Sequence, residues 1–112
     1  MLFKQNRLKK QNDFKKVFKQ GMHCACQFIF LKILKNNLND SRFGFIVSNK
    51  ISKKAVERNK IKRRLRDIVR RSLSETKSGY DIIIEAKPGI EKLGYNEMKA
   101  GLLGLFKKAG LL

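Results

Sequence analysis

Residues 53–73 combine charge of one sign with a helical apolar stripe, and this segment constrains the fold more than any other. Ten of the 27 lysines and arginines lie between Lys53 and Arg71, where only Glu57 and Asp67 oppose them. Apolar residues recur there three or four positions apart, as on one face of an α-helix. They are Ile61, Leu65, Ile68, Val69 and Leu73. The pattern predicts a long helix, capped by Ser52, that buries this stripe.

One face of the predicted helix carries only basic and amide side chains. At about 100° per residue, five of them fall within an arc of about 100° beside the apolar stripe. They are Asn59, Lys62, Arg63, Arg66 and Arg70. A solvated face usually mixes charge signs because like charges repel, so this face predicts a polyanionic partner. Arginine binds phosphate bidentately and stacks on bases, and asparagine can bond a base edge or a 2′-hydroxyl, which favours nucleic acid.

The charge of the whole chain supports the same partner. A formal net charge of +18 makes the compact state repel itself unless anions lie nearby. An anionic membrane is disfavoured, because the apolar runs fall far short of the ~20 residues that span a bilayer. Lys4, Arg7, Lys9 and Lys10 interrupt the apolar region that a secretory signal would need, so we expect a cytoplasmic protein.

The rest of the chain predicts one domain over residues 1–112, since no repeat or proline-rich linker divides it. A short first helix runs from a cap at Asn12 to Gly21. Residues 27–34 and 42–48 are β-branched and aromatic, and the turn-forming segment between them predicts an antiparallel pair.

Two elements complete the chain after the basic helix. Residues 80–86, YDIIIEA, are an apolar run that predicts an interior strand. A final helix is expected from a cap at Asn96 to Gly110. Its buried residues should be Met98, Leu102, Leu105, Phe106 and Ala109. The predicted order is helix, two or three strands, helix, strand, helix, in a small α/β sandwich.

The segment HCAC places His23, Cys24 and Cys26 close together, which raises the possibility of a zinc site. A structural zinc site needs a fourth ligand, and no other Cys or His exists in the sequence. The favoured interpretation is two reduced thiols on one face of a strand, because residues i and i+2 point the same way.

The basic helix also carries a family resemblance. KAVERNKIKRRLR resembles the RNR signature of the bacterial ribonuclease P protein, with Arg58, Asn59, Lys62, Arg63 and Arg66 at its basic positions. NRLKKQNDFKKVF, RFGFIVSNK and YDIIIEAKP resemble the family's first helix, the strand before the basic helix and the final strand. The resemblance implies an α/β (α+β) two-layer sandwich in the order α-β-β-β-α-β-α. Its mixed four-stranded sheet and three helices include a left-handed βαβ crossover.

The resemblance further implies a non-catalytic subunit of the ribonucleoprotein endoribonuclease P, which matures the 5′ end of tRNA. The residues expected to bind the catalytic RNA subunit are Arg58, Asn59, Lys62, Arg63, Arg66 and Arg70. Those expected to hold the single-stranded 5′ leader of precursor tRNA are Phe14, Phe18, Ser48, Lys50 and Lys87. Mg²⁺ is expected to be held mainly by the RNA subunit, with no protein-bound cofactor. From spacing alone, Phe14 and Phe18 could equally be core residues of one helical stripe.

Three other functions fit parts of the sequence. A general basic RNA-binding protein, such as a ribosomal protein or an RNA chaperone, fits the charge and size equally well but does not explain the ordered signature. A DNA-reading helix is disfavoured, because its base contacts usually concentrate at the amino-terminal residues. A self-sufficient nuclease is disfavoured because the nine carboxylates lie scattered from Asp13 to Glu97 without paired spacing.

Overall fold

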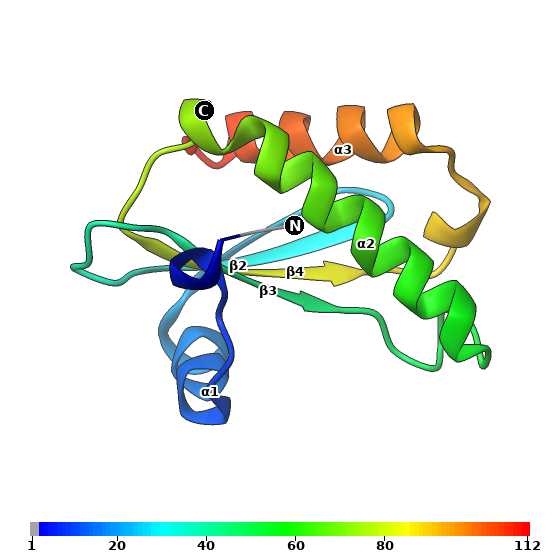
Figure 1. The fold of residues 1–112 in the computed structure, drawn as a ribbon, viewed down its shortest axis with the longest axis horizontal. Coiled ribbons are helices and arrows are strands. Elements are labelled where there is room, and N and C mark those ends of the chain that lie inside the picture. Colours follow the sequence, from blue (N-terminus) through cyan, green and yellow to red (C-terminus); the bar gives the residue numbers. More distant parts are fainter. Residues whose placement is uncertain (1–2) are drawn as a thin grey trace.

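The computed structural model describes residues 3–112, which form a mixed four-stranded sheet packed between helices (Figure 1). The described α-helices are α1 (Gln11–Gln20), α2 (Ala55–Ser72) and α3 (Tyr95–Lys108). The strands are β1 (Met22–Ala25), β2 (Ile29–Lys35), β3 (Arg42–Ile46) and β4 (Tyr80–Ala86). The order α-β-β-β-α-β-α confirms the expected fold class.

The sheet order is β1-β2-β4-β3, so the expected antiparallel pairing of residues 27–34 with residues 42–48 is wrong. β4 lies between these two strands, antiparallel to β2 and parallel to β3. β4 takes this central position because of its composition. Ile82, Ile83 and Ile84 are fully buried, so both faces of the strand must be covered by other parts of the protein. The predicted interior position of this strand is confirmed.

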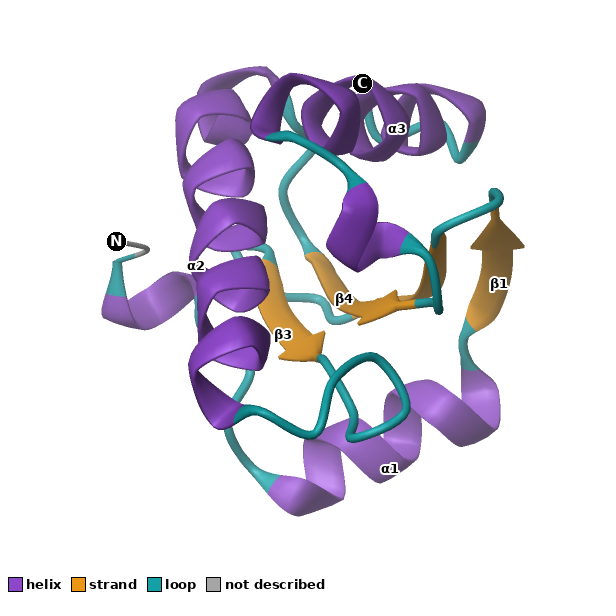
Figure 2. Cartoon of the chain, turned by 90° about the vertical axis from the view of Figure 1, so that its right-hand side faces the viewer, coloured by secondary structure: helices purple, strands orange, loops and turns teal. Residues whose placement is uncertain are grey.

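The connection from β3 through α2 to β4 is left-handed. In Figure 1 both strands run from left to right beneath α2. In Figure 2, where the front of that view lies on the left, β3 lies to the left of β4. Seen from the helices with both strands pointing upward, the chain therefore steps left from β3 to β4. About 98% of such crossovers are right-handed, so the resemblance predicted what the general rule would have missed.

Helices cover both faces of the sheet, with α2 and α3 on one face and α1 on the other (Figure 1). The predicted stripe of α2 is confirmed, since all but the half-buried Leu73 lie in the main core. Four of the residues expected to be buried in α3 are buried, and Ala109 packs against them. On the opposite face, Val17 of α1 joins Leu8 and Ile83 in a second, smaller cluster. α1 is thus the least deeply anchored helix.

All three predicted amino-terminal helix caps are wrong, although the helices themselves and the end of α1 at Gly21 are confirmed. α1 begins after Lys10 rather than at Asn12, and α2 begins after Lys54. Ser52 nevertheless organises the first turn of α2, because its hydroxyl accepts from the Lys54 backbone N–H and donates to Glu57. α3 begins after Gly94, whose N–H donates to the Glu97 side chain, and Asn96 lies too late in the chain to act as a cap.

Candidate nucleic-acid interface

The exposed side of α2 carries all six residues expected to bind the RNA subunit. The buried stripe fixes the rotation of the helix, so the adjoining basic face is directed away from the core. Asn59, Arg63, Arg66 and Arg70 are exposed, whereas Arg58 and Lys62 are half-buried at the edge of the face. The structure therefore brings the six together as one continuous surface.

Three of these arginines also contact the protein, which restricts their orientation. The Arg66 guanidinium carbon lies 5.8 Å from the centre of the Phe45 ring, within cation–π range. An Arg58 guanidinium nitrogen (Nη1) donates to the backbone oxygen of Ser52 at 2.9 Å. Arg70 pairs with Asp67 at 3.0 Å. Orientation set before binding lowers the entropic cost of holding a ligand.

Asp67 and Tyr95 form a small polar cluster at the edge of the basic face that the sequence did not reveal. The Asp67 carboxylate accepts from Arg70, from Arg71 and from the Tyr95 hydroxyl at 2.8 Å. These contacts lower the pKa of Asp67, with the Tyr95 hydrogen bond as the largest cause and Arg70 next. Desolvation and the Asp67 hydrogen bond raise the pKa of Tyr95. The cluster joins α2 to the start of α3.

The two phenylalanines expected to contact the leader differ in their surroundings. Phe14 is half-buried and packs against the cluster formed by Leu8, Val17 and Ile83. Its ring lies on the backbone of Gly44, where an added Cβ would come within 2.4 Å of the ring. Phe18 is 39% exposed. Phe14 thus packs against the sheet with part of its surface exposed, whereas Phe18 presents a more exposed aromatic surface to solvent.

The other three residues expected to contact the leader lie at one end of the sheet. β3 and β4 are parallel, so the residues that follow them emerge at the same end. Ser48 and Lys50 are exposed in the turn after β3. Lys87, after β4, is half-buried, and its ammonium donates to the backbone oxygen of Cys26 at 3.0 Å.

His23 and Phe30 add an aromatic stack that no sequence pattern indicates. Their ring centres lie 6.0 Å apart with an interplanar angle of 13°. They are diagonal neighbours, since His23 pairs with Lys32 and Phe30 with Ala25 on adjacent strands. Phe30 alternates with the core residues Ile29 and Leu31, so the stack lies on the face that α1 partly covers. Only the strand register could have revealed this pair.

No metal site is found in the described part of the chain, because no three His, Cys, Asp or Glu residues there lie close enough together to hold a metal ion. Cys24 and Cys26 are free thiols that pack against the core beneath α2 and α3. His23 points to the opposite face, because adjacent strand residues alternate. Cys24 and Cys26 therefore lie on the same face, as the favoured interpretation of HCAC expected, although Cys26 follows the end of β1. No described helix is long and apolar enough to cross a membrane.

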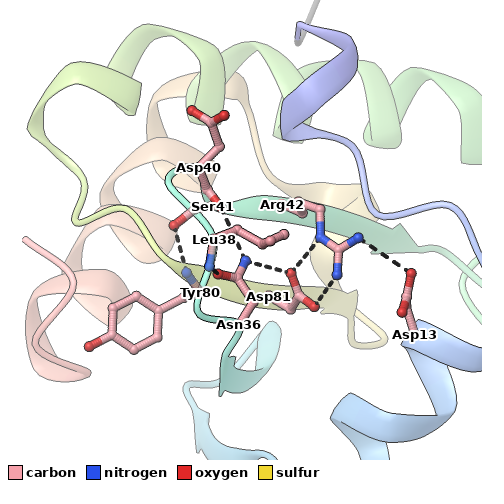
Figure 3. A network of polar contacts seen from close by, with 8 residues as sticks. All are labelled: Asp13, Asn36, Leu38, Asp40, Ser41, Arg42, Tyr80 and Asp81. Atoms are coloured by element: carbon pink, nitrogen blue, oxygen red, sulfur yellow. Dashed lines mark hydrogen bonds and ion pairs between the residues drawn. The ribbon is translucent and has the colours of Figure 1, made fainter.

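A polar network centred on Arg42 and Asp81 links α1 to the sheet (Figure 3). Arg42 donates two hydrogen bonds to the buried Asp81 carboxylate, at 2.8 Å and 2.6 Å. Asn36 donates a third to Asp81, and Arg42 also reaches Asp13 of α1 at 3.4 Å (Figure 3). The hydrogen bond to Asp81 is the main cause that raises the pKa of Arg42. The helix that carries Phe18 is therefore positioned partly by this network.

Comparisons with known proteins agree with this architecture. The family model described as Ribonuclease P matches residues 2–110. The chain is 38% identical to the ribonuclease P protein component of Syntrophomonas wolfei, covering 99% of this chain and 92% of the relative. It is 40% identical to that of Pseudanabaena sp., covering 100% and 97%. Among solved structures, a Staphylococcus aureus RNase P protein mutant with defective mRNA degradation activity aligns with a TM-score of 0.91. That alignment has 29% identity and covers 97% of this chain and 92% of the mutant.

Proposed function

The chain belongs to the bacterial ribonuclease P protein component family, so it is the protein subunit of an RNA-catalysed endoribonuclease. We propose that two separate surfaces of this protein bind two different RNAs. The basic face of α2 binds the catalytic RNA subunit. The surface formed by α1, the open side of the sheet and the ends of β3 and β4 binds the 5′ leader of precursor tRNA. The chain acts as one domain over residues 1–112 in the cytoplasm.

One observation carries the first half of the proposal: the basic face of α2 is exposed, continuous and of one sign along its length. A rigid helix that presents arginines and one asparagine matches a folded RNA, in which phosphates and 2′-hydroxyls are displayed along a groove. The pairing of Asp67 with Arg70 and Arg71 limits repulsion at one edge without interrupting the face.

The leader half of the proposal rests on accessible aromatic rings and on cations at one end of the sheet. Single strands are held without strong sequence preference by rings on which bases stack and by positive charges that follow the backbone. The exposed Phe18 ring and the stack of His23 on Phe30 supply the first. Lys50 and Lys87, at one end of the sheet, supply the second.

The Mg²⁺ that supports cleavage is held, in this proposal, by the RNA. The residues of this chain do not fit a magnesium site, because no three potential ligands among His, Cys, Asp and Glu come together in the described part. What the protein contributes is charge: its cations offset phosphate repulsion between the two RNAs and reduce the magnesium needed for assembly.

A comparison of two variants tests the division of labour. Arg63→Ala with Arg66→Ala should weaken binding to the RNA subunit and reduce its salt dependence, by roughly 0.7 to 0.9 in the log–log slope for each phosphate left unneutralised. Phe18→Ala should leave that binding intact and lower the preference for precursor over mature tRNA. Equal effects of both variants on assembly would contradict the two-surface proposal.

A further inference from the structure

A pocket of about 340 Å³ lies at the outer edge of β3, between the two proposed surfaces. The amino-terminal segment runs beside β3 only as far as Leu8, whose N–H donates to the Phe43 backbone oxygen at 2.9 Å. Phe45, two residues further along the strand, lines the pocket beyond this contact. The volume lies within the range of about 300–1,000 Å³ typical of sites for small ligands.

The lining of this pocket combines apolar and aromatic side chains with three cationic ones, Arg7, Lys9 and Arg66. Leu8 and Phe43, both almost fully buried, form an apolar floor. The rings of Phe14 and Phe45 form walls, and both remain partly exposed. Apolar walls of this kind accept a flat ring. The half-buried Arg7 also lines the pocket and adds a positive charge beside them.

The rim of the pocket supplies positive charge, which its apolar walls lack. Lys9 and Arg66 line the pocket and are exposed, so their charged groups can reach a phosphate outside while the walls hold a ring inside. Arg66 already lies against the Phe45 ring, and a guanidinium plane is itself a surface on which bases stack. An aromatic pocket with a cationic rim is complementary to one unstacked nucleotide.

We propose that this pocket binds a single unstacked nucleotide of the RNA subunit, its base held between Phe14 and Phe45 and its phosphate by Lys9 and Arg66. The RNA subunit is the source because Arg66 belongs to the basic face of α2, so RNA lying on that face passes the mouth of the pocket. The inference rests on the proposed function and gives that interface a base-binding site beside its phosphate contacts.

The test compares RNA-subunit affinity across a salt series for Phe45→Leu, Phe45→Tyr and Lys9→Gln, with Arg63→Ala as a control outside the pocket. Phe45→Leu keeps an apolar side chain but removes the ring, so affinity should fall about 5- to 150-fold with an unchanged salt slope. Phe45→Tyr should restore most of the affinity. Lys9→Gln, an exposed change that does not threaten folding, should reduce both the affinity and the slope.

Each contrary result points to a different failure. Unchanged RNA-subunit affinity in both Phe45→Leu and Lys9→Gln would overturn the nucleotide site, even if Arg63→Ala behaves as proposed. If Phe45→Leu instead lowers only the preference for precursor over mature tRNA, the assignment to the RNA subunit is wrong. If Arg63→Ala changes nothing, the proposed function of α2 itself fails.

Discussion

Replacing Arg42 by alanine should destabilise the fold by about 3 kcal/mol, far more than removing the charge of its other partner, Asp13. The structural reason is the unequal burial of the two carboxylates that Arg42 contacts. The side chain of Asp81 is 7% exposed and receives two short hydrogen bonds from Arg42. Asp13 is 28% exposed and meets Arg42 once, at 3.4 Å.

The size of each loss of stability depends on which charge the substitution leaves without its partner. Breaking a buried ion pair costs about 3–5 kcal/mol, because the remaining charge stays desolvated. In Arg42→Ala, Asn36 still donates a hydrogen bond to Asp81. The Arg42 side chain is 25% exposed, so water can partly take the place of its guanidinium beside Asp81. Both effects favour the lower end of this range. Asp13→Ala removes a partly solvated pair worth about 0–1 kcal/mol.

Thermal unfolding followed by circular dichroism measures both effects. For a domain near this size 1 kcal/mol corresponds to roughly 4 °C in Tm, so Arg42→Ala should lower Tm by about 12 °C and Asp13→Ala by at most about 4 °C. Arg42→Lys, which keeps the charge but loses the bidentate geometry, should fall between them. Equal Tm shifts for Arg42→Ala and Asp13→Ala would show that the burial of Asp81 does not determine the loss of stability.

Three further predictions concern anion binding, the pKa of Asp67 and the activity of the chain without RNA. Sulfate should raise Tm more than chloride at equal ionic strength, because a fold of net charge +18 gains stability from any anion that its native state binds; coincident melts would mean that no such sites exist. Tyr95→Phe should raise the pKa of Asp67 in an NMR titration, since the Tyr95 hydrogen bond is the main cause that lowers it. Because the folded-state pKa lies below the unfolded one, this carboxylate stabilises the fold at neutral pH and loses that contribution below about pH 4, so an unchanged pKa in the variant would count against the cluster. The purified chain without RNA should cleave neither precursor tRNA nor mRNA, although one structural relative is described as a mutant with defective mRNA degradation activity. Cleavage that disappears with a single carboxylate substitution would identify a nuclease.

The sequence was sufficient for features that depend on local periodicity. The stripe of α2 and the apolar run of β4 each required burial of a particular kind, and both are buried as predicted. The basic face followed directly, because the stripe fixes which side of α2 meets solvent.

Features that depend on distant partners were not predictable in this way. β2 and β3 are both good strands, but nothing local says that β4 will separate them. Arg42 and Asp81, or Asp67 and Tyr95, are separated by 39 and 28 residues, so their pairing appears only once the fold is known. The left-handed crossover came from the family resemblance alone, since general physics favours the opposite hand.

Reconstitution with a bacterial ribonuclease P RNA tests the central claim most directly. Single-turnover cleavage of precursor tRNA is measured with and without the chain over a magnesium series. We predict a marked acceleration at low magnesium that shrinks at high magnesium, where the RNA cleaves unaided, because the protein's cations substitute for screening ions. A folded chain that leaves the rate unchanged at every magnesium concentration would contradict this claim.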